Sequence, residues 1–194
     1  MKLTGKKLIL LLLYAPTVGE KVNEPIGGRT RLMKMVFLFK EEVLIDFQRD
    51  KTFDEVDLPE YFAWKYGPFS SELLNDLEFL VNQLYICRSE SEAAVSDLVV
   101  SEAELREYDF WVDDVDEFQT KEYAEEVFEL TVERGIPKAK EIWDRLSNNQ
   151  KEYLQEFKKV LNRAALSRII EYVYKKYQKN GYVDKSLIRE RYLS

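Results

Sequence analysis

Histidine is absent from this chain of 194 residues, and cysteine occurs only once, at Cys87. The absence of histidine excludes the Ser-His and Cys-His catalytic pairs and removes the commonest metal ligand. A single cysteine excludes an intrachain disulfide and any metal site built from several thiolates, and it suits a reducing compartment. Glycine and proline are scarce, with 7 and 5 residues, so a collagen-like chain is excluded as well.

Motifs for nucleotide or metal binding are also missing. The chain contains neither a Walker A sequence nor a dinucleotide fingerprint. Its densest carboxylate cluster, which includes Asp109, Asp113 and Glu117, lacks the alternating ligands and the central glycine of an EF-hand. Cys87, next to Ile86, fits a small buried apolar residue better than a nucleophile. We therefore predict a protein that is not an enzyme and that holds no cofactor and no metal.

The most apolar run, residues 8–15, is far too short to cross a membrane. Three lysines precede it, which is the order of charge and hydrophobicity in a secretory signal. The same residues fit a buried first helix that Pro16 stops, and we favour that interpretation over a signal. No other stretch approaches the roughly 18 apolar residues of a membrane helix. We expect a cytoplasmic protein without a membrane partner.

The remaining composition is that of a globular protein, with 45% hydrophobic and 34% charged residues. The net charge of −7 hides a strong segregation along the chain. Residues 1–40 and 151–194 carry +6 each, whereas residues 41–60 and 89–126 carry −6 and −12. An acidic run is usually a solvated surface loop, and the alternative is a docking site for a cationic partner.

Hydrophobic periodicity predicts three helices in the first half of the chain, at about 3–15, 30–43 and 70–84. Thr30 is the expected cap of the second helix, and Ser70 or Ser71 caps the third. Between these two helices we expect an acidic surface connection. An extended aromatic segment that turns at Gly67 and Pro68 then follows it.

The second half begins with short β-forming runs at 85–87, 98–100 and 108–112, which predict a long hairpin decorated by acidic loops, and Val127, Phe128 and Leu130 then lead into Thr131. Amphipathic helical patterns follow up to about residue 177, with a break at Asn148 and Asn149. The last dozen residues are expected to form a loosely held tail. The fold class predicted from this order is mainly α, within the α+β class.

Three helices followed by a hairpin is the element order of a winged helix, a helix-turn-helix variant whose third helix commonly enters the DNA major groove. Two motifs carry a family resemblance: PIGGRTRLMK at 25–34 and AWKYGPFS at 63–70. They resemble the YwgA-like group of uncharacterised bacterial and archaeal winged-helix proteins, and more distantly the Panacea antitoxin domain. The runs FELT at 128–131 and EYVYKKY at 171–177 look like that group's later strand-to-helix junction and its final helix.

The resemblance spans roughly residues 3–177. We expect a winged-helix-like domain with acidic loops over residues 1–131 and a helical extension over 132–194 packed on it. The resemblance lends no catalytic residue to this chain. It implies a non-enzymatic module, either a transcription regulator or a protein that recognises another protein, as an antitoxin recognises a toxin.

The second of these motifs has a structural explanation of its own. Gly67 permits a tight turn, Pro68 fixes the backbone before the helix, and Ser70 or Ser71 caps the helix. The aromatic residues Trp64, Tyr66 and Trp111 are expected to pack in the core, with stacking on a ligand as the alternative.

The third helix suits DNA poorly, because its polar positions include three carboxylates and neither Lys nor Arg. Its amides Asn75, Asn82 and Gln83 are nevertheless of the type that reads adenine. A second DNA-binding mode would use another basic face. The candidate contacts with nucleic acid or with an acidic partner are Lys6, Lys7, Arg29, Arg31 and Lys34.

The carboxy-terminal helices offer further cations, namely Lys158, Lys159, Arg163, Arg168, Lys175 and Lys176. The alternative is that these side chains only solubilise amphipathic helices. The same long helices are a candidate homodimer interface. We expect a regulatory or antitoxin-like module that acts by protein recognition. The alternative function is a DNA-binding transcriptional regulator that uses a basic face other than the third helix.

Overall fold

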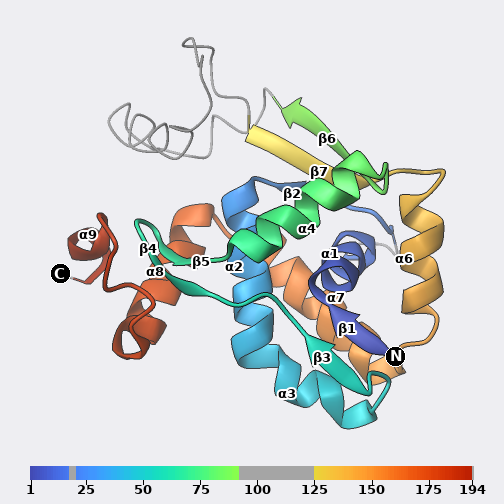
Figure 1. Cartoon of the computed structure of the whole chain (residues 1–194), viewed down its shortest axis with the longest axis horizontal. Helices are drawn as coiled ribbons and strands as arrows, with labels where there is room; N and C mark the ends of the chain where they lie inside the picture. Colours follow the sequence, from blue (N-terminus) through green and yellow to red (C-terminus); the bar gives the residue numbers. More distant parts are fainter. Residues whose placement is uncertain (18–20, 92–124, 194) are drawn as a thin grey trace.

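The protein is described by a computed structural model, and the residues that it describes are 1–17, 21–91 and 125–193. They form a mixed α+β fold that is mainly helical (Figure 1). Trp111, the carboxylate cluster at 109–117 and most of the expected hairpin lie outside these ranges. The strand that pairs with Ile86–Ser91 is Glu125–Leu130, a segment that was expected only to lead into Thr131. None of the described helices is long and apolar enough to span a membrane.

Helix α1 (Gly5–Tyr14) lies in the centre of the core, and every apolar side chain in it is buried. The side chain of Thr4 accepts a hydrogen bond from the Lys7 backbone N–H and begins the helix, which ends before Pro16 as predicted. The helix starts later than residue 3 because Lys2–Thr4 form strand β1. This strand pairs in parallel with β3 (Glu55–Asp57).

Helix α2 (Arg29–Leu38) runs on through a π-helical turn (Phe39–Val43) into α3 (Leu44–Phe47). Gly28, with φ of 82°, precedes the first helical residue, so the predicted cap at Thr30 is wrong. The acidic connection predicted before the aromatic segment is only partly irregular, because α3, a 3-10 turn and β3 occupy much of it.

Strands β4 (Phe62–Trp64) and β5 (Gly67–Phe69) form a short antiparallel hairpin. The extended segment and its turn were predicted, whereas the second strand was not. The buried Ser70 hydroxyl then accepts a hydrogen bond from the Leu73 backbone N–H at 3.2 Å and caps α4 (Ser71–Asn82). The predicted third helix and its cap are therefore confirmed. One side of α4 contributes Leu73, Leu77 and Leu80 to the core.

A second, antiparallel sheet has the strand order β2-β7-β6. Its strands are β2 (Ile26–Gly27), β7 (Glu125–Leu130) and β6 (Ile86–Ser91). The register pairs Ile26 with Phe128 and Ile86 with Leu130, and all four side chains enter the core. Figure 1 shows this sheet along the upper edge, with α1 beneath it and α4 beside it.

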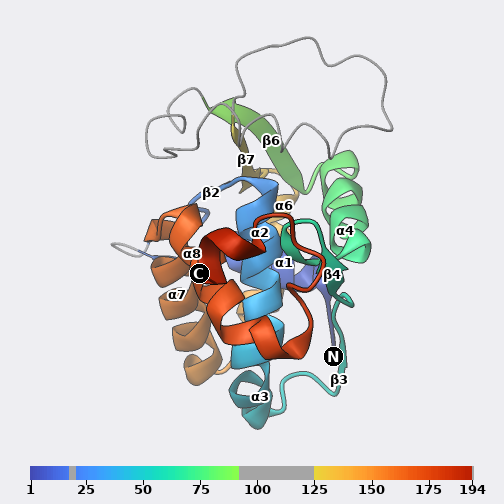
Figure 2. The same ribbon diagram turned by 90° about the vertical axis from the view of Figure 1, so that its left-hand side faces the viewer.

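The later helices are α6 (Gly135–Trp143), α7 (Asn148–Arg163) and α8 (Leu166–Tyr177). They share one buried apolar cluster with α1 and α2, in which α8 packs on α2, and α7 packs on α1 and α3. Figure 2 views the molecule from the side on which α8 lies. Ser147 and Gln150 form a capping box, so Asn148 and Asn149 begin α7.

The chain after α8 is held in place, so the expectation of a loose tail is wrong for its described part. Val183 is fully buried against Tyr174, and the Leu187 backbone N–H donates to the Lys65 carbonyl at 2.8 Å. The short helix α9 (Arg189–Leu193) follows.

Candidate functional site

The basic residues predicted as contacts form bonds within the chain instead. Lys6 makes an ion pair with Asp76 of α4, and the Lys7 Nζ donates to the Lys2 carbonyl. Arg31 donates to the carbonyls of Leu161 and Ala164 at 2.6 and 2.7 Å, at the carboxyl end of α7.

Lys34 is 3% exposed and therefore does not lie on an exposed basic face. Its Nζ donates to the carbonyls of Tyr66 at 3.0 Å and Pro68 at 2.8 Å, on either side of Gly67 in the hairpin turn. Burial lowers the pKa of Lys34 to about 7. The expected basic face of the second helix is thus incomplete, because β5 and α8 pack on α2.

Lys158 is also buried, although it is one of the candidate cations of the carboxy-terminal helices. Its Nζ donates to the carbonyls of Leu13 and Ala15 at 2.8 and 3.0 Å, at the carboxyl end of α1. Burial lowers the pKa of Lys158 to about 8. Arg168 and Lys175 remain exposed on α8, where both pair with Glu171.

Gly67 occupies a position that requires glycine. Its φ is 87°, and a Cβ atom there would lie 3.0 Å from the ring of Tyr174. The neighbouring Trp64 was expected in the core but is 37% exposed. Its ring lies beside those of Phe62 and Phe69, at centroid distances of 6.0 and 6.3 Å.

Cys87 was expected to be buried beside Ile86, and it is exposed. Successive side chains of a strand point to opposite faces of the sheet, so the burial of Ile86 directs Cys87 outward.

The solvent-exposed side of α4 is the strongest candidate for a functional surface. We call it the α4 face, and it consists of Glu72, Asn75, Phe79, Asn82, Gln83 and Leu84. The first five recur at helical spacing, and Leu84 follows the last turn. Phe79 is 47% exposed and Leu84 is 62% exposed. Large apolar side chains therefore stand on a side of the helix where they stay exposed among the residues that the structure describes.

Carboxylates flank the α4 face, and cations from neighbouring elements compensate two of them. Asp76 pairs with Lys6, whose Nζ lies 5.0 Å from the centroid of the Phe79 ring. Glu78 pairs with Arg29 at 3.0 Å and with Arg88 at 3.1 Å. The predicted acidic helix is thus largely neutralised on folding.

Leu84 has a left-handed backbone, with φ of 58°. The N–H groups of Leu84 and Tyr85 donate to the carbonyls of Val81 and Leu80, both at 2.9 Å, which is a Schellman motif with Leu84 at the position that glycine usually takes. A side chain there costs about 1–2 kcal/mol. The sequence pattern placed Leu84 in the buried stripe of α4, and its exposure corrects that prediction.

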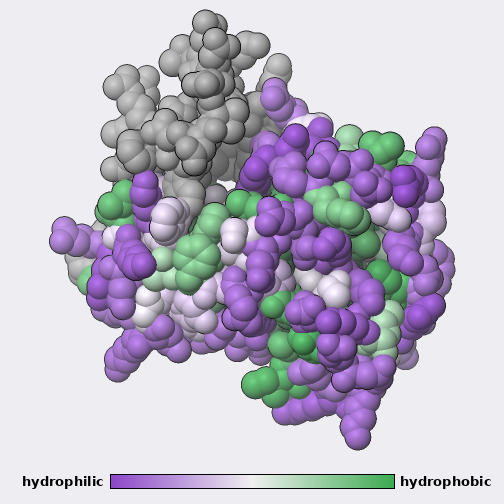
Figure 3. Space-filling view, in the orientation of Figure 1, coloured by the Kyte–Doolittle hydropathy of each residue, from purple (hydrophilic) through white to green (hydrophobic). Residues whose placement is uncertain are grey.

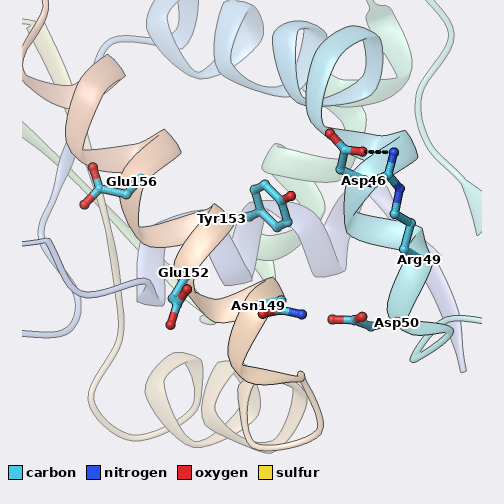
Figure 4. Close-up of a pocket in the computed structure, with 7 residues that line it drawn as sticks. All are labelled: Asp46, Arg49, Asp50, Asn149, Glu152, Tyr153 and Glu156. Carbon is cyan, nitrogen blue, oxygen red and sulfur yellow. Dashed lines mark ion pairs between the residues drawn. The ribbon is translucent and has the colours of Figure 1, made fainter.

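A hollow of about 550 Å³ lies apart from the α4 face, between α3 and the first half of α7 (Figure 4). Its lining consists of Asp46, Arg49, Asp50, Asn149, Glu152, Tyr153 and Glu156. The cation Arg49 pairs with Asp46 at 2.7 Å. Within the described ranges, no group of three or more carboxylates or thiols could hold a metal ion. None of the residues predicted as contacts lines this hollow.

Comparison with protein-family profiles, curated proteins and solved structures finds no match to this chain.

The sequence pattern identifies the amides and carboxylates of α4 as polar positions of the helix. It does not identify Phe79 or Leu84 as exposed residues. Phe79 had a usable signal, because it falls off the spacing of the buried stripe that Leu73, Leu77 and Leu80 form. No signal in the sequence indicates that Leu84 is exposed, because its left-handed backbone is a property of the folded chain.

Proposed function

We propose that the chain is a non-enzymatic regulatory or antitoxin-like module that recognises another protein through the α4 face. The exposed pair Phe79 and Leu84, beside Asp76 and Glu78 whose charges are compensated, carries the proposal. The centres of protein interfaces are poor in charge and rich in aromatic residues. A surface that binds the phosphates of a nucleic acid, in contrast, presents Lys and Arg side chains without compensating carboxylates.

The order of the elements supports a winged-helix arrangement for this module. Helices α1, α2 and α4 precede the antiparallel pair β6 and β7, and β2 joins that pair as a third strand. In this proposal α4 takes the place of the third helix, and most of the expected wing, between Cys87 and Glu107, lies outside the described ranges. The same order is compatible with the resemblance to YwgA-like proteins, which stays a prediction.

The alternative function, a DNA-binding regulator, has two observations in its favour. The amides of Asn75, Asn82 and Gln83 are exposed and of the type that reads adenine. Arg168 and Lys175 are exposed on α8, beside a shallow hollow of about 600 Å³. Because Glu171 pairs with both cations, we place this function second.

Capture from native lysate tests the proposal. The double variant Phe79→Ser and Leu84→Ser is compared with the wild type and with Val132→Ser, a control at a 77% exposed apolar residue outside α4. We expect the wild type and the control to retain a stoichiometric partner that the double variant loses. A partner that the double variant retains, or no enriched partner at all, would contradict the proposal.

Binding to random duplex DNA tests the alternative. Fluorescence anisotropy across roughly 50–200 mM salt reports non-specific phosphate affinity before any question of operator sequence. We expect no binding at the lowest salt. Micromolar binding with a steep salt dependence, abolished by Arg168→Glu and Lys175→Glu, would favour the DNA-binding function.

A further inference from the structure

The α4 face is self-complementary, and we infer that it pairs with the α4 face of a second copy of this chain, antiparallel about a two-fold axis at Phe79. The inference rests on the proposed function only in taking the α4 face as a protein-binding surface. A two-fold contact uses the same patch on both subunits, so each residue must suit the one it meets.

Phe79 lies in the middle of the α4 face, four residues after Asn75 and four before Gln83. Antiparallel helices crossing at Phe79 place Asn75 opposite Gln83 of the second copy, and Gln83 opposite Asn75. Each amide offers both donors and an acceptor, so two amides that face each other can exchange hydrogen bonds. The two Phe79 rings meet at the axis, where an interface centre is typically aromatic.

The same register brings Asp76 opposite Asn82 of the second copy, so a carboxylate meets an amide donor. The Lys6 ammonium beside each Phe79 ring is compensated by its ion pair with Asp76. The side chains of Asn75, Asn82 and Gln83 are exposed and form no hydrogen bond with the other residues that the structure describes. Leu84 extends the apolar area toward the first turn of the second α4.

The carboxy-terminal helices, where the sequence places a candidate homodimer, are less complementary. On α8 the exposed apolar side chain at the centre is Tyr172. An antiparallel pair about Tyr172 would place Arg168 opposite Lys176 twice, and like charges in contact repel. The Tyr172 hydroxyl is also occupied, because it donates to Glu42 at 3.0 Å.

Two helices of this length bury less than the roughly 1,600 Å² of a standard interface, so we expect a weak dimer with a dissociation constant of about 10–100 μM. Disulfide trapping tests its geometry in the full chain. Cys87→Ser serves as the background, because Cys87 is exposed and would itself cross-link. In that background, Phe79→Cys places two thiols at the proposed axis.

The matched control is Tyr172→Cys, at a residue that is 44% exposed on α8 and also close to a lysine. With oxidised glutathione and equal protein concentrations, we expect Phe79→Cys to form the covalent dimer at least about tenfold faster than the control, since an axis holds equivalent thiols in contact. Equal rates, or faster trapping of Tyr172→Cys, would overturn the inference.

Sedimentation equilibrium provides a measurement that does not depend on cysteine variants. The wild-type mass is expected to rise toward twice the monomer mass with concentration. Phe79→Ser should weaken the dimer at least about tenfold, and Val160→Ser, at an exposed residue of α7, should not. A wild type that stays monomeric up to about 1 mM overturns the inference. If the wild type stays monomeric but the Phe79→Ser and Leu84→Ser double variant loses a captured protein other than this chain, the dimer is overturned and the proposed function is still supported. The failure of the inference and the failure of the proposed function are therefore distinguishable.

Discussion

Lys34 and Lys158 each place an amine in the interior, where it donates to two backbone carbonyls. Lys34 joins α2 to the hairpin turn, and Lys158 joins α7 to the carboxyl end of α1. Burying a charged amine costs free energy, so burial lowers the pKa of Lys34 to about 7 and that of Lys158 to about 8. Both side chains therefore have a structural role, and neither is exposed to bind a phosphate.

Lys34→Met is expected to alter how stability depends on pH. The pKa of Lys34 falls from 10.5 to about 7 on folding, so between these values the unfolded chain binds more protons and the free energy of unfolding rises with pH. Methionine removes this contribution, so the wild type should gain roughly 1–3 kcal/mol relative to the variant between about pH 7 and 9. Urea unfolding at several pH values measures the difference, and parallel curves for the two proteins would contradict the assignment.

Leu84→Gly is expected to stabilise the fold by about 0.5–1 kcal/mol, because it relieves the left-handed strain that Leu84 carries. Val160→Gly is the matched control, at an equally exposed apolar residue inside α7, and should cost about 1 kcal/mol. Thermal unfolding of both variants checks this. A loss of stability in Leu84→Gly similar to that of the control would mean that Leu84 is held by packing.

At the scale of elements, the hairpin and α4 act as one unit that orients the α4 face. Lys34 holds the hairpin turn, the ring of Tyr174 covers Gly67, and Ser70 caps the helix that follows. The direction of α4 thus depends on contacts with α2 and α8. The motif that carries the family resemblance is explained by this structural role.

Gly67→Ala is expected to destabilise the protein by roughly 2–4 kcal/mol, since it adds both left-handed strain and a clash with the buried Tyr174 ring. Gly181→Ala provides the control: φ there is 78°, but the nearest atom is an Asp184 carboxylate oxygen at 3.4 Å. The control should lose only about 1–2 kcal/mol. Urea unfolding distinguishes the two, and equal losses would show that the Tyr174 contact is unimportant.

At the scale of the whole molecule, cations of the basic amino-terminal block pair with carboxylates from later in the chain. The amino-terminal cation Lys6 pairs with Asp76, and Arg29 pairs with Glu78 and Glu126. In the view of Figure 3, hydrophilic residues cover most of the surface and hydrophobic ones form small separate patches. A docking surface on this face is therefore small, and its central apolar residues decide its affinity.

The helices were predictable because burial imposes a period on the sequence, as the stripe of Leu73, Leu77 and Leu80 on α4 illustrates. The Ser70 cap was predictable because its chemistry is local. The burial of Lys34 was not, since it depends on a turn 32 residues further along the chain. The parallel pairing of β1 with β3 joins two three-residue segments, which are too short to carry a periodic signal.

The central claim is that Phe79 and Leu84 are exposed for recognition and are not remnants of a core. Capture of the partner by Leu84→Gly, with its thermal unfolding measured on the same sample, tests this most directly, because unfolding cannot then explain a loss of binding. We predict a protein at least as stable as the wild type that captures several-fold less partner, whereas Val132→Ser captures as much as the wild type. Undiminished capture by Leu84→Gly would contradict the assignment of the α4 face.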